Sequence, residues 1–203
     1  MNERERALRA TAELWSEVGY ENLNAGAICA RAAIAPEAFA AEFPSIEKAA
    51  KATLELTIAE VVRLMAAEFG PDRSEPESCA LGIVAILEFM AVNPALAYVL
   101  YVGRRQRLPA ALRETSRIAQ RFVVALLDRL RESSSSSEQP RSAAAGALGA
   151  PEAVIRREIL AGRTALLDSL APDLAYGALV PFMGQAEALR FARLCAGRSP
   201  GAA

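Results

Sequence analysis

Residues 24–48, NAGAICARAAIAPEAFAAEFPSIEK, contain the signals of two short helices joined by a tight turn. Asn24 can cap the first helix, because its side-chain oxygen can accept from an exposed backbone amide. Pro36 suits the first turn of the second helix, which would bury Phe39 and Phe43. This pattern predicts the outline of a helix-turn-helix.

The flanking residues complete the predicted N-terminal region. Apolar side chains at spacings of three and four predict a helix over 3–18, and Gly19 provides its C-terminal stop. Ser45 is placed to cap a long helix over 45–69. We therefore expect a helix-turn-helix domain over residues 1–52, joined by this long helix to the rest of the chain.

Residues 53–203 also show helical spacing, with no alternating run long enough to require a strand, so the expected fold class is all-α. The further helices are expected over residues 77–92, 94–102, 109–131, 151–170 and 172–196. Residues 133–150 contain five consecutive serines and many small side chains. We predict a mobile loop there, because little apolar surface is available to offset the entropy of ordering.

The composition argues against several classes of protein. The absence of histidine removes Ser-His-Asp and Cys-His catalysis and histidine zinc sites. The three cysteines lie far apart, which argues against a disulfide framework or a thiolate metal site and fits a reducing cytoplasm. The segment from Ser45 to Lys48 matches the Ser-x-x-Lys of acylating serine enzymes, but the companion motifs are missing. We expect a soluble cytoplasmic protein that is not an enzyme, with no cofactor, no metal, no secretory signal and no membrane span.

Residues 13–20 (ELWSEVGY), 28–35 (ICARAAIA) and 39–47 (FAAEFPSIE) form a recognisable pattern. They resemble the N-terminal domain of the TetR family of bacterial repressors, over roughly residues 3–60. The resemblance implies a homodimer that binds double-stranded DNA and releases it when a small-molecule effector binds. It also implies that residues 53–203 form a ligand-binding and dimerisation domain, whose last two helices build a four-helix interface.

Several residues depart from the family's usual pattern. Ala33 stands where the family usually has glycine, Ala35 where it has a capping serine, and Ala40 where it has a phosphate-binding tyrosine. Glu42 stands in place of a histidine or tyrosine. The candidate DNA-binding residues, carried over from the family's positions, are Arg31, Ala35, Pro36, Glu37, Ala38, Ala40, Ala41, Glu42, Lys48 and Lys51.

The charge of this region is unusual for a DNA-binding domain. Residues 1–52 carry six basic side chains and eight glutamates, a net charge of −2, although phosphate contacts supply most non-specific affinity for DNA. Glu37 can satisfy the dipole at the start of its helix, or it can accept from cytosine in the major groove. Arg4, Arg6 and Arg9 can reach a neighbouring groove or form a solvated face. The sequence therefore leaves the strength of DNA binding open.

The C-terminal region concentrates arginine in one segment. Six arginines fall within eighteen residues, at Arg104, Arg105, Arg107, Arg113, Arg117 and Arg121. They form a solvated face, a site for an anionic ligand or acidic partner, or support for DNA binding. Residues within and beside this segment form a candidate effector pocket, with core packing as the alternative for the aromatic ones. The candidate pocket residues are Phe89, Met90, Tyr98, Tyr101, Arg105 and Phe122.

The last two expected helices combine an apolar stripe with small residues that permit close packing. We expect a two-fold interface there, with packing inside one chain as the alternative. The candidate interface residues are Ile155, Ile159, Leu166, Gly177, Pro181, Gly184 and Ala188. Pro181 is expected to bend the last helix, because proline removes a backbone hydrogen bond.

Two functions follow from these observations. The first is a TetR-like DNA-binding transcriptional regulator, a repressor that responds to a small-molecule ligand. The second is a protein of the same fold with weakened or lost DNA binding, which acts as a ligand- or partner-binding modulator. The family resemblance favours the first function, and the missing DNA contacts favour the second.

Overall fold

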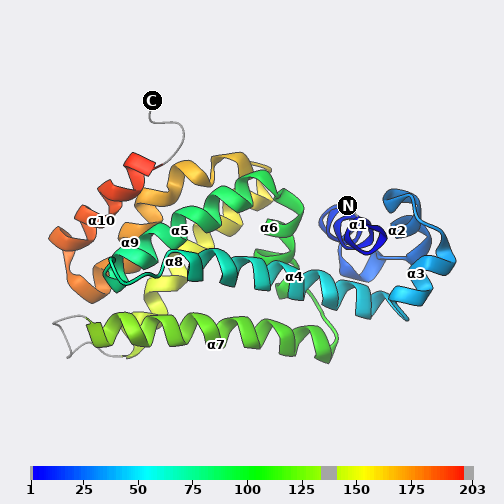
Figure 1. Cartoon of the computed structure of the whole chain (residues 1–203), viewed down its shortest axis with the longest axis horizontal. Coiled ribbons are helices and arrows are strands. Elements are labelled where there is room, and N and C mark those ends of the chain that lie inside the picture. Colours follow the sequence, from blue (N-terminus) through cyan, green and yellow to red (C-terminus); the bar gives the residue numbers. More distant parts are fainter. Residues whose placement is uncertain (1, 134–140, 199–203) are drawn as a thin grey trace. The chain divides into compact units, whose positions relative to one another are not determined.

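A computed structural model describes residues 2–133 and 141–198, and all the regular secondary structure within these residues is helical (Figure 1). The predicted all-α fold class is confirmed. No single helix in this part of the chain is long and apolar enough to cross a membrane.

The chain forms two compact units. The head unit consists of Met1–Glu60 and Ala95–Gln120, and the bundle unit consists of Val61–Pro94 and Arg121–Ala203. The sequence predicts a single boundary after residue 52, whereas the structure divides the chain after Glu60, Pro94 and Gln120. Ala95–Gln120 belongs to the head unit because its apolar side chains pack against the N-terminal helices.

The helix-turn-helix is present and its helices lie close to their predicted positions. The helices are α1 (Glu3–Val18), η1 (Tyr20–Asn22, a 3-10 helix), α2 (Ala25–Ala32) and α3 (Pro36–Glu42). Asn24 caps α2 as predicted, because its side chain accepts from the Ala27 amide at 2.8 Å. Local capping signals therefore place these helices.

The turn between α2 and α3 is strained at Ala33. This residue has φ 51° and ψ 53°, in the left-handed region, where a β-carbon costs about 1–2 kcal/mol. Glycine would avoid that cost. Arg6 of α1 supports the turn by donating to the carbonyls of Ala32 at 3.0 Å and Ala33 at 3.4 Å.

Two apolar clusters stabilise the head unit. The first joins α1 to α2 and α3 through Leu8, Ile28 and Phe39, and it also contains Phe43, so both phenylalanines are buried as predicted. The second cluster surrounds the fully buried Trp15. Its members are Ala12, Trp15, Ala50, Leu54, Val99, Leu108 and Leu112.

The long helix α4 (Ile46–Ala67) contributes to both clusters, and Ser45 caps it as predicted by accepting from the Lys48 amide at 3.2 Å. The chain returns to the head unit with α6 (Pro94–Tyr101), η2 (Gly103–Arg105) and the first half of α7 (Ala110–Ser133). These elements lie close to the predicted helices 94–102 and 109–131.

The bundle unit is built around α5 (Glu75–Val92), which contacts α9, α10 and η3. Buried residues occur on all sides of α5, so this helix lies at the centre of the bundle unit. The remaining elements are α8 (Arg141–Leu160), η3 (Thr164–Leu166), η4 (Asp168–Leu170), α9 (Ala171–Met183) and α10 (Gln185–Arg198).

Three predictions for the bundle unit are wrong. The helix predicted over 151–170 ends at Leu160, because Gly162 adopts a φ of 70°, and the short 3-10 helices η3 and η4 follow it. Residues 141–150, predicted as part of the loop 133–150, form the first half of α8, because the high helix propensity of alanine outweighs the glycines. Residues 134–140 of that predicted loop lie outside the described residues. The single predicted helix 172–196 is instead divided into α9 and α10 at Gly184, whose φ of 78° ends α9.

Candidate nucleic-acid interface and effector region

The outward face of α3 is made of small and acidic residues. Among the predicted contact residues here, Ala38 is half-buried and the exposed ones are Ala35, Pro36, Glu37, Ala40, Ala41 and Glu42. Alanine and proline side chains offer no hydrogen-bonding group, so the polar side chains on this face are two glutamates. Ala35 makes no side-chain cap to α3. The face therefore has little means of holding a phosphate backbone.

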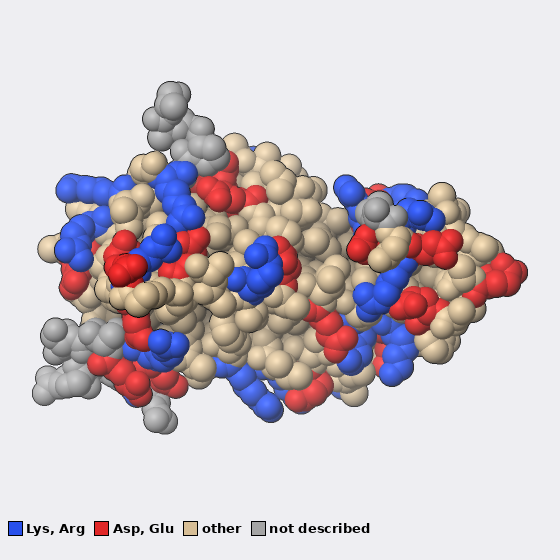
Figure 2. All heavy atoms as spheres, viewed as in Figure 1, with Lys and Arg blue, Asp and Glu red and all other residues tan. Residues whose placement is uncertain are grey.

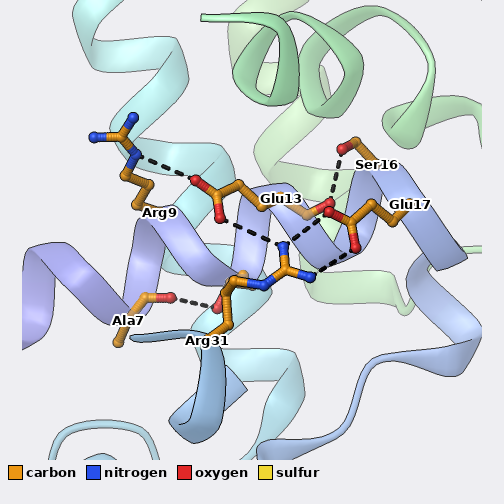
Figure 3. Close-up of polar contacts among 7 residues, drawn as sticks. Ala7, Arg9, Glu13, Ser16, Glu17 and Arg31 are labelled. Carbon is orange, nitrogen blue, oxygen red and sulfur yellow. Dashed lines mark hydrogen bonds and ion pairs between the residues drawn. The ribbon is translucent and has the colours of Figure 1, made fainter. Parts of the chain in front are cut away.

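Arg31 of α2 is held by two carboxylates of α1 (Figure 3). Its Nη1 and Nη2 donate to the two oxygens of Glu17 at 2.8 and 2.9 Å, and Nη1 also donates to Glu13 at 3.5 Å. These hydrogen bonds raise the pKa of Arg31 and lower the pKa of Glu17. Arg9 donates to the same Glu13 at 3.2 Å. The charge of Arg31 is thus balanced within the head unit.

Other cations of the head unit are also paired. The Arg4 Nε donates to Glu42 at 2.7 Å, and Lys51 pairs with Glu55 one turn further along α4. Lys48 is exposed and makes no ion pair within residues 2–133 and 141–198. On the face that Figure 2 shows, acidic and basic side chains alternate over α1–α3.

A hollow of about 220 Å³ lies between α1 and α2, and it shows the same mixture of charges. It is lined by Arg6, Arg9, Ala10, Glu13, Arg31 and Ala32. The guanidiniums of Arg9 and Arg31 both donate to Glu13 within this lining. The hollow is therefore lined by the ion pairs that join the two helices.

The predicted pocket residues divide between the two units. Tyr98, Tyr101 and Arg105 belong to the head unit, whereas Phe89, Met90 and Phe122 belong to the bundle unit. Met90 is fully buried, Phe89 and Phe122 are half-buried, and Arg105 is exposed. Burial raises the pKa of Tyr101 and lowers the pKa of the neighbouring Arg104. The effector pocket remains a prediction.

Gln106, which no pattern in the sequence indicates, connects three residues of the head unit. Its Oε1 accepts from Trp15 Nε1 at 2.9 Å and from the Tyr20 amide at 3.2 Å, and its Nε2 donates to the Tyr98 hydroxyl at 3.2 Å. Its partners lie up to 91 residues away, so no local pattern could have revealed them. Gln106 is a functional candidate that sequence reasoning missed.

Two buried carboxylates of the bundle unit each bind two arginines. Glu68, just after α4, accepts from Arg198 of α10 at 2.9 Å through both oxygens and from Arg73 at 2.6 Å. The hydrogen bonds from Arg198 are the main reason why the pKa of Glu68 is lowered. Glu158 of α8 is held in the same way, by Arg157 at 2.9 Å and Arg163 at 2.7 Å. Within the described residues, no three potential metal ligands come together.

The predicted interface residues differ in their exposure within one chain. Ile155, Ile159 and Ala188 are buried, Gly177 and Pro181 are half-buried, and Leu166 and Gly184 are exposed. Because α8 packs on α9 of the same chain, the intramolecular alternative is sufficient to explain the burial of the two isoleucines. Leu160, Leu189 and Leu194 are further apolar side chains exposed in the bundle unit. Dimerisation remains a prediction.

Solved structures of transcriptional regulators share this fold. The fatty acid degradation regulator FadR from Bacillus halodurans has a TM-score of 0.76 at 16% identity, over 86% of this chain and 97% of its own. FadR from Bacillus subtilis, solved in complex with stearoyl-CoA, has a TM-score of 0.74 at 16% identity, over 89% and 98%. A TetR-like regulator from Rhodococcus sp. RHA1 has a TM-score of 0.71 at 21% identity, over 88% and 96%.

Comparisons of the sequence itself gave no such match. No family model matches the chain, and no curated protein matches it. The structural likenesses, at 16–21% identity, show the fold: this chain has the all-α architecture of TetR-type regulators.

Proposed function

We propose that this protein is a ligand-responsive transcriptional regulator of the TetR type. The observation that carries this proposal is the helix-turn-helix of α1–α3 followed by a helical bundle, in an arrangement that matches regulators over nearly their whole length. Double-stranded DNA and a small-molecule effector are the partners that this function requires. The protein acts as a cytoplasmic homodimer, and the apolar side chains exposed in the bundle unit support association.

Long-chain acyl-CoA is the effector class to test first. The structural neighbour from Bacillus subtilis was solved with stearoyl-CoA. An acyl-CoA combines an apolar tail with several phosphates. The arginine-rich segment from Arg104 to Arg121 suits the phosphates of such a ligand.

A second candidate function is favoured by the ion pairs of the head unit. Arg4 and Arg31 are engaged by carboxylates of the same chain, and α3 presents two glutamates. Each phosphate contact that is missing removes about one unit of counterion release from DNA binding. The alternative protein is therefore a ligand- or partner-binding modulator that keeps the fold but does not hold DNA by itself.

A duplex titration separates the two functions. The full-length protein is titrated with random-sequence double-stranded DNA at about 50 mM salt, and again at rising salt. A DNA-binding regulator binds at low salt and loses affinity steeply as the salt concentration rises. If no binding is found at low salt, the regulator function is rejected and the modulator function is retained.

A further inference from the structure

We propose that Gln106 latches the corner segment, residues 103–112, onto α1, so that the corner between α6 and α7 moves with the helix-turn-helix as one rigid body. The inference rests on the proposed function in one respect: a regulator must convey an effector signal to its head. Gln106 is then a positioning residue, because it acts through Trp15 and Tyr20.

Both polar atoms of the Gln106 side-chain amide form hydrogen bonds. Oε1 accepts two hydrogen bonds, from the Trp15 indole at 2.9 Å and from the Tyr20 backbone at 3.2 Å. Nε2 donates to the Tyr98 hydroxyl of α6 at 3.2 Å. A single side chain thereby joins α1, η1 and α6.

The two donors that Gln106 satisfies have strong need of an acceptor. Trp15 is fully buried, so its indole N–H depends on a protein partner rather than on bulk water. The Tyr20 amide stands at the start of η1, where a helix leaves its first N–H groups without an internal acceptor. Losing Gln106 would therefore leave both donors unsatisfied.

Apolar packing fixes the same segment on the same helix. Leu108 and Leu112 lie in the cluster around Trp15. Gly103 approaches the indole so closely that a β-carbon would lie 3.0 Å from the Trp15 Nε1. The apolar contacts supply attraction, and the directional amide selects one alignment of the corner segment against α1.

The latch determines whether the corner segment moves with the helix-turn-helix. The backbone passes between the two units in α4 after Glu60, at Pro94 before α6, and in α7 after Gln120. With the corner segment latched, a displacement of α6 is conveyed to α1 through Gln106 as well as along α4. Without the latch, the apolar contacts around Trp15 remain, but they no longer hold a single alignment of the corner segment against α1.

The test uses the full-length protein and the Gln106→Met variant, which keeps the side-chain length but removes the amide. Gln120→Met is the matched control, because Gln120 is exposed in α7. Gln106→Glu is the rescue, because its carboxylate can still accept from Trp15 and Tyr20. Trp15 is the sole tryptophan, so its indole N–H gives a single NMR signal.

We expect the Trp15 indole proton to exchange with solvent about tenfold faster in Gln106→Met, and to stay near the wild-type rate in Gln106→Glu and Gln120→Met. Native-state exchange in low denaturant is then followed at the amides of α1 and of Ala110–Ser116. In the wild type both groups open together. In Gln106→Met the amides of Ala110–Ser116 open before those of α1. Simple destabilisation would instead lower the free energy of opening of both groups by the same amount.

Separate opening in the wild type would overturn the latch, and so would joint opening that persists in Gln106→Met. These measurements need neither DNA nor effector, so they do not depend on the regulator function. Random-sequence duplex is added in a final arm. A failure to bind it rejects the proposed regulator but leaves the exchange result on the latch unchanged.

Discussion

Both the head unit and the bundle unit contain ion pairs between arginine and glutamate, but Glu17 of the head unit is exposed, whereas Glu68 and Glu158 of the bundle unit are buried. In the head unit, the partners Arg31 and Glu17 have side chains that are 37% and 50% exposed. In the bundle unit, the carboxylates of Glu68 and Glu158 are only 10% and 7% exposed. Exposed pairs contribute little to stability, whereas a buried carboxylate cannot lose its partners without a large cost. The head pairs therefore contribute little to stability, and their main effect is to balance the charges of Arg4 and Arg31 within the head unit.

The largest expected effect follows from reversing charge on the head. Glu37→Lys with Glu42→Lys replaces both glutamates of the α3 face and releases Arg4 from its ion pair. We expect affinity for random-sequence duplex to rise about a hundredfold at about 50 mM salt, because two or more phosphate contacts are gained. Fluorescence anisotropy with labelled duplex measures the change.

The control for this prediction carries the same charge change in the bundle unit, as Asp173→Lys with Glu187→Lys. If the control binds DNA as tightly as the head variant, net charge alone is responsible. If the head variant binds duplex no more tightly than the wild type, repulsion by Glu37 and Glu42 is not what weakens DNA binding by the head unit.

Removing one carboxylate from each unit tests the comparison of burial directly. Glu68→Gln should lower the free energy of unfolding by about 2 kcal/mol, because two half-exposed arginines lose a charged acceptor. Glu17→Gln should leave the free energy of unfolding unchanged within error, because its pair with Arg31 is exposed. Denaturant titration of both variants measures the difference, and equal destabilisation would show that burial does not separate the two kinds of pair.

Acid should weaken the bundle unit through Glu68. Its folded-state pKa is lowered from the ordinary value of 4.5, chiefly by hydrogen bonds from Arg198. Its contribution is therefore complete above pH 4.5 and is lost as the pH falls through the lower folded-state pKa. The unfolding free energies of the wild type and Glu68→Gln should converge on acidification. Parallel curves down to the acid limit would contradict this assignment.

The smallest expected effect concerns the backbone of the helix-turn-helix. Ala33→Gly should raise stability by about 1 kcal/mol, because glycine adopts the left-handed conformation of this turn without strain. Ala30→Gly, in the interior of α2, should lower stability by about the same amount. Opposite signs for these matched variants would confirm the strain at Ala33, and a loss of stability in both would argue against it.

Local signals in the sequence were enough to predict the helices of the head. Asn24, Pro36 and Ser45 act on backbone groups within three residues, so the starts of α2, α3 and α4 could be predicted without knowledge of the fold. The same reasoning failed for residues 141–150, where the serines of the preceding stretch obscured the helix propensity of the alanines. At Gly184 the break was missed because a helical glycine and a helix-ending glycine look alike in sequence.

The sequence by itself determined the all-α class, the helix-turn-helix and the small, acidic character of the α3 face, because capping, periodicity and side-chain chemistry are local properties. Only the tertiary structure decided how the charges and polar groups are paired. Arg31 meets Glu17 across 14 residues of sequence, and Gln106 meets Trp15 across 91. Such pairs depend on which helices the apolar clusters bring together, and no local pattern carries that information.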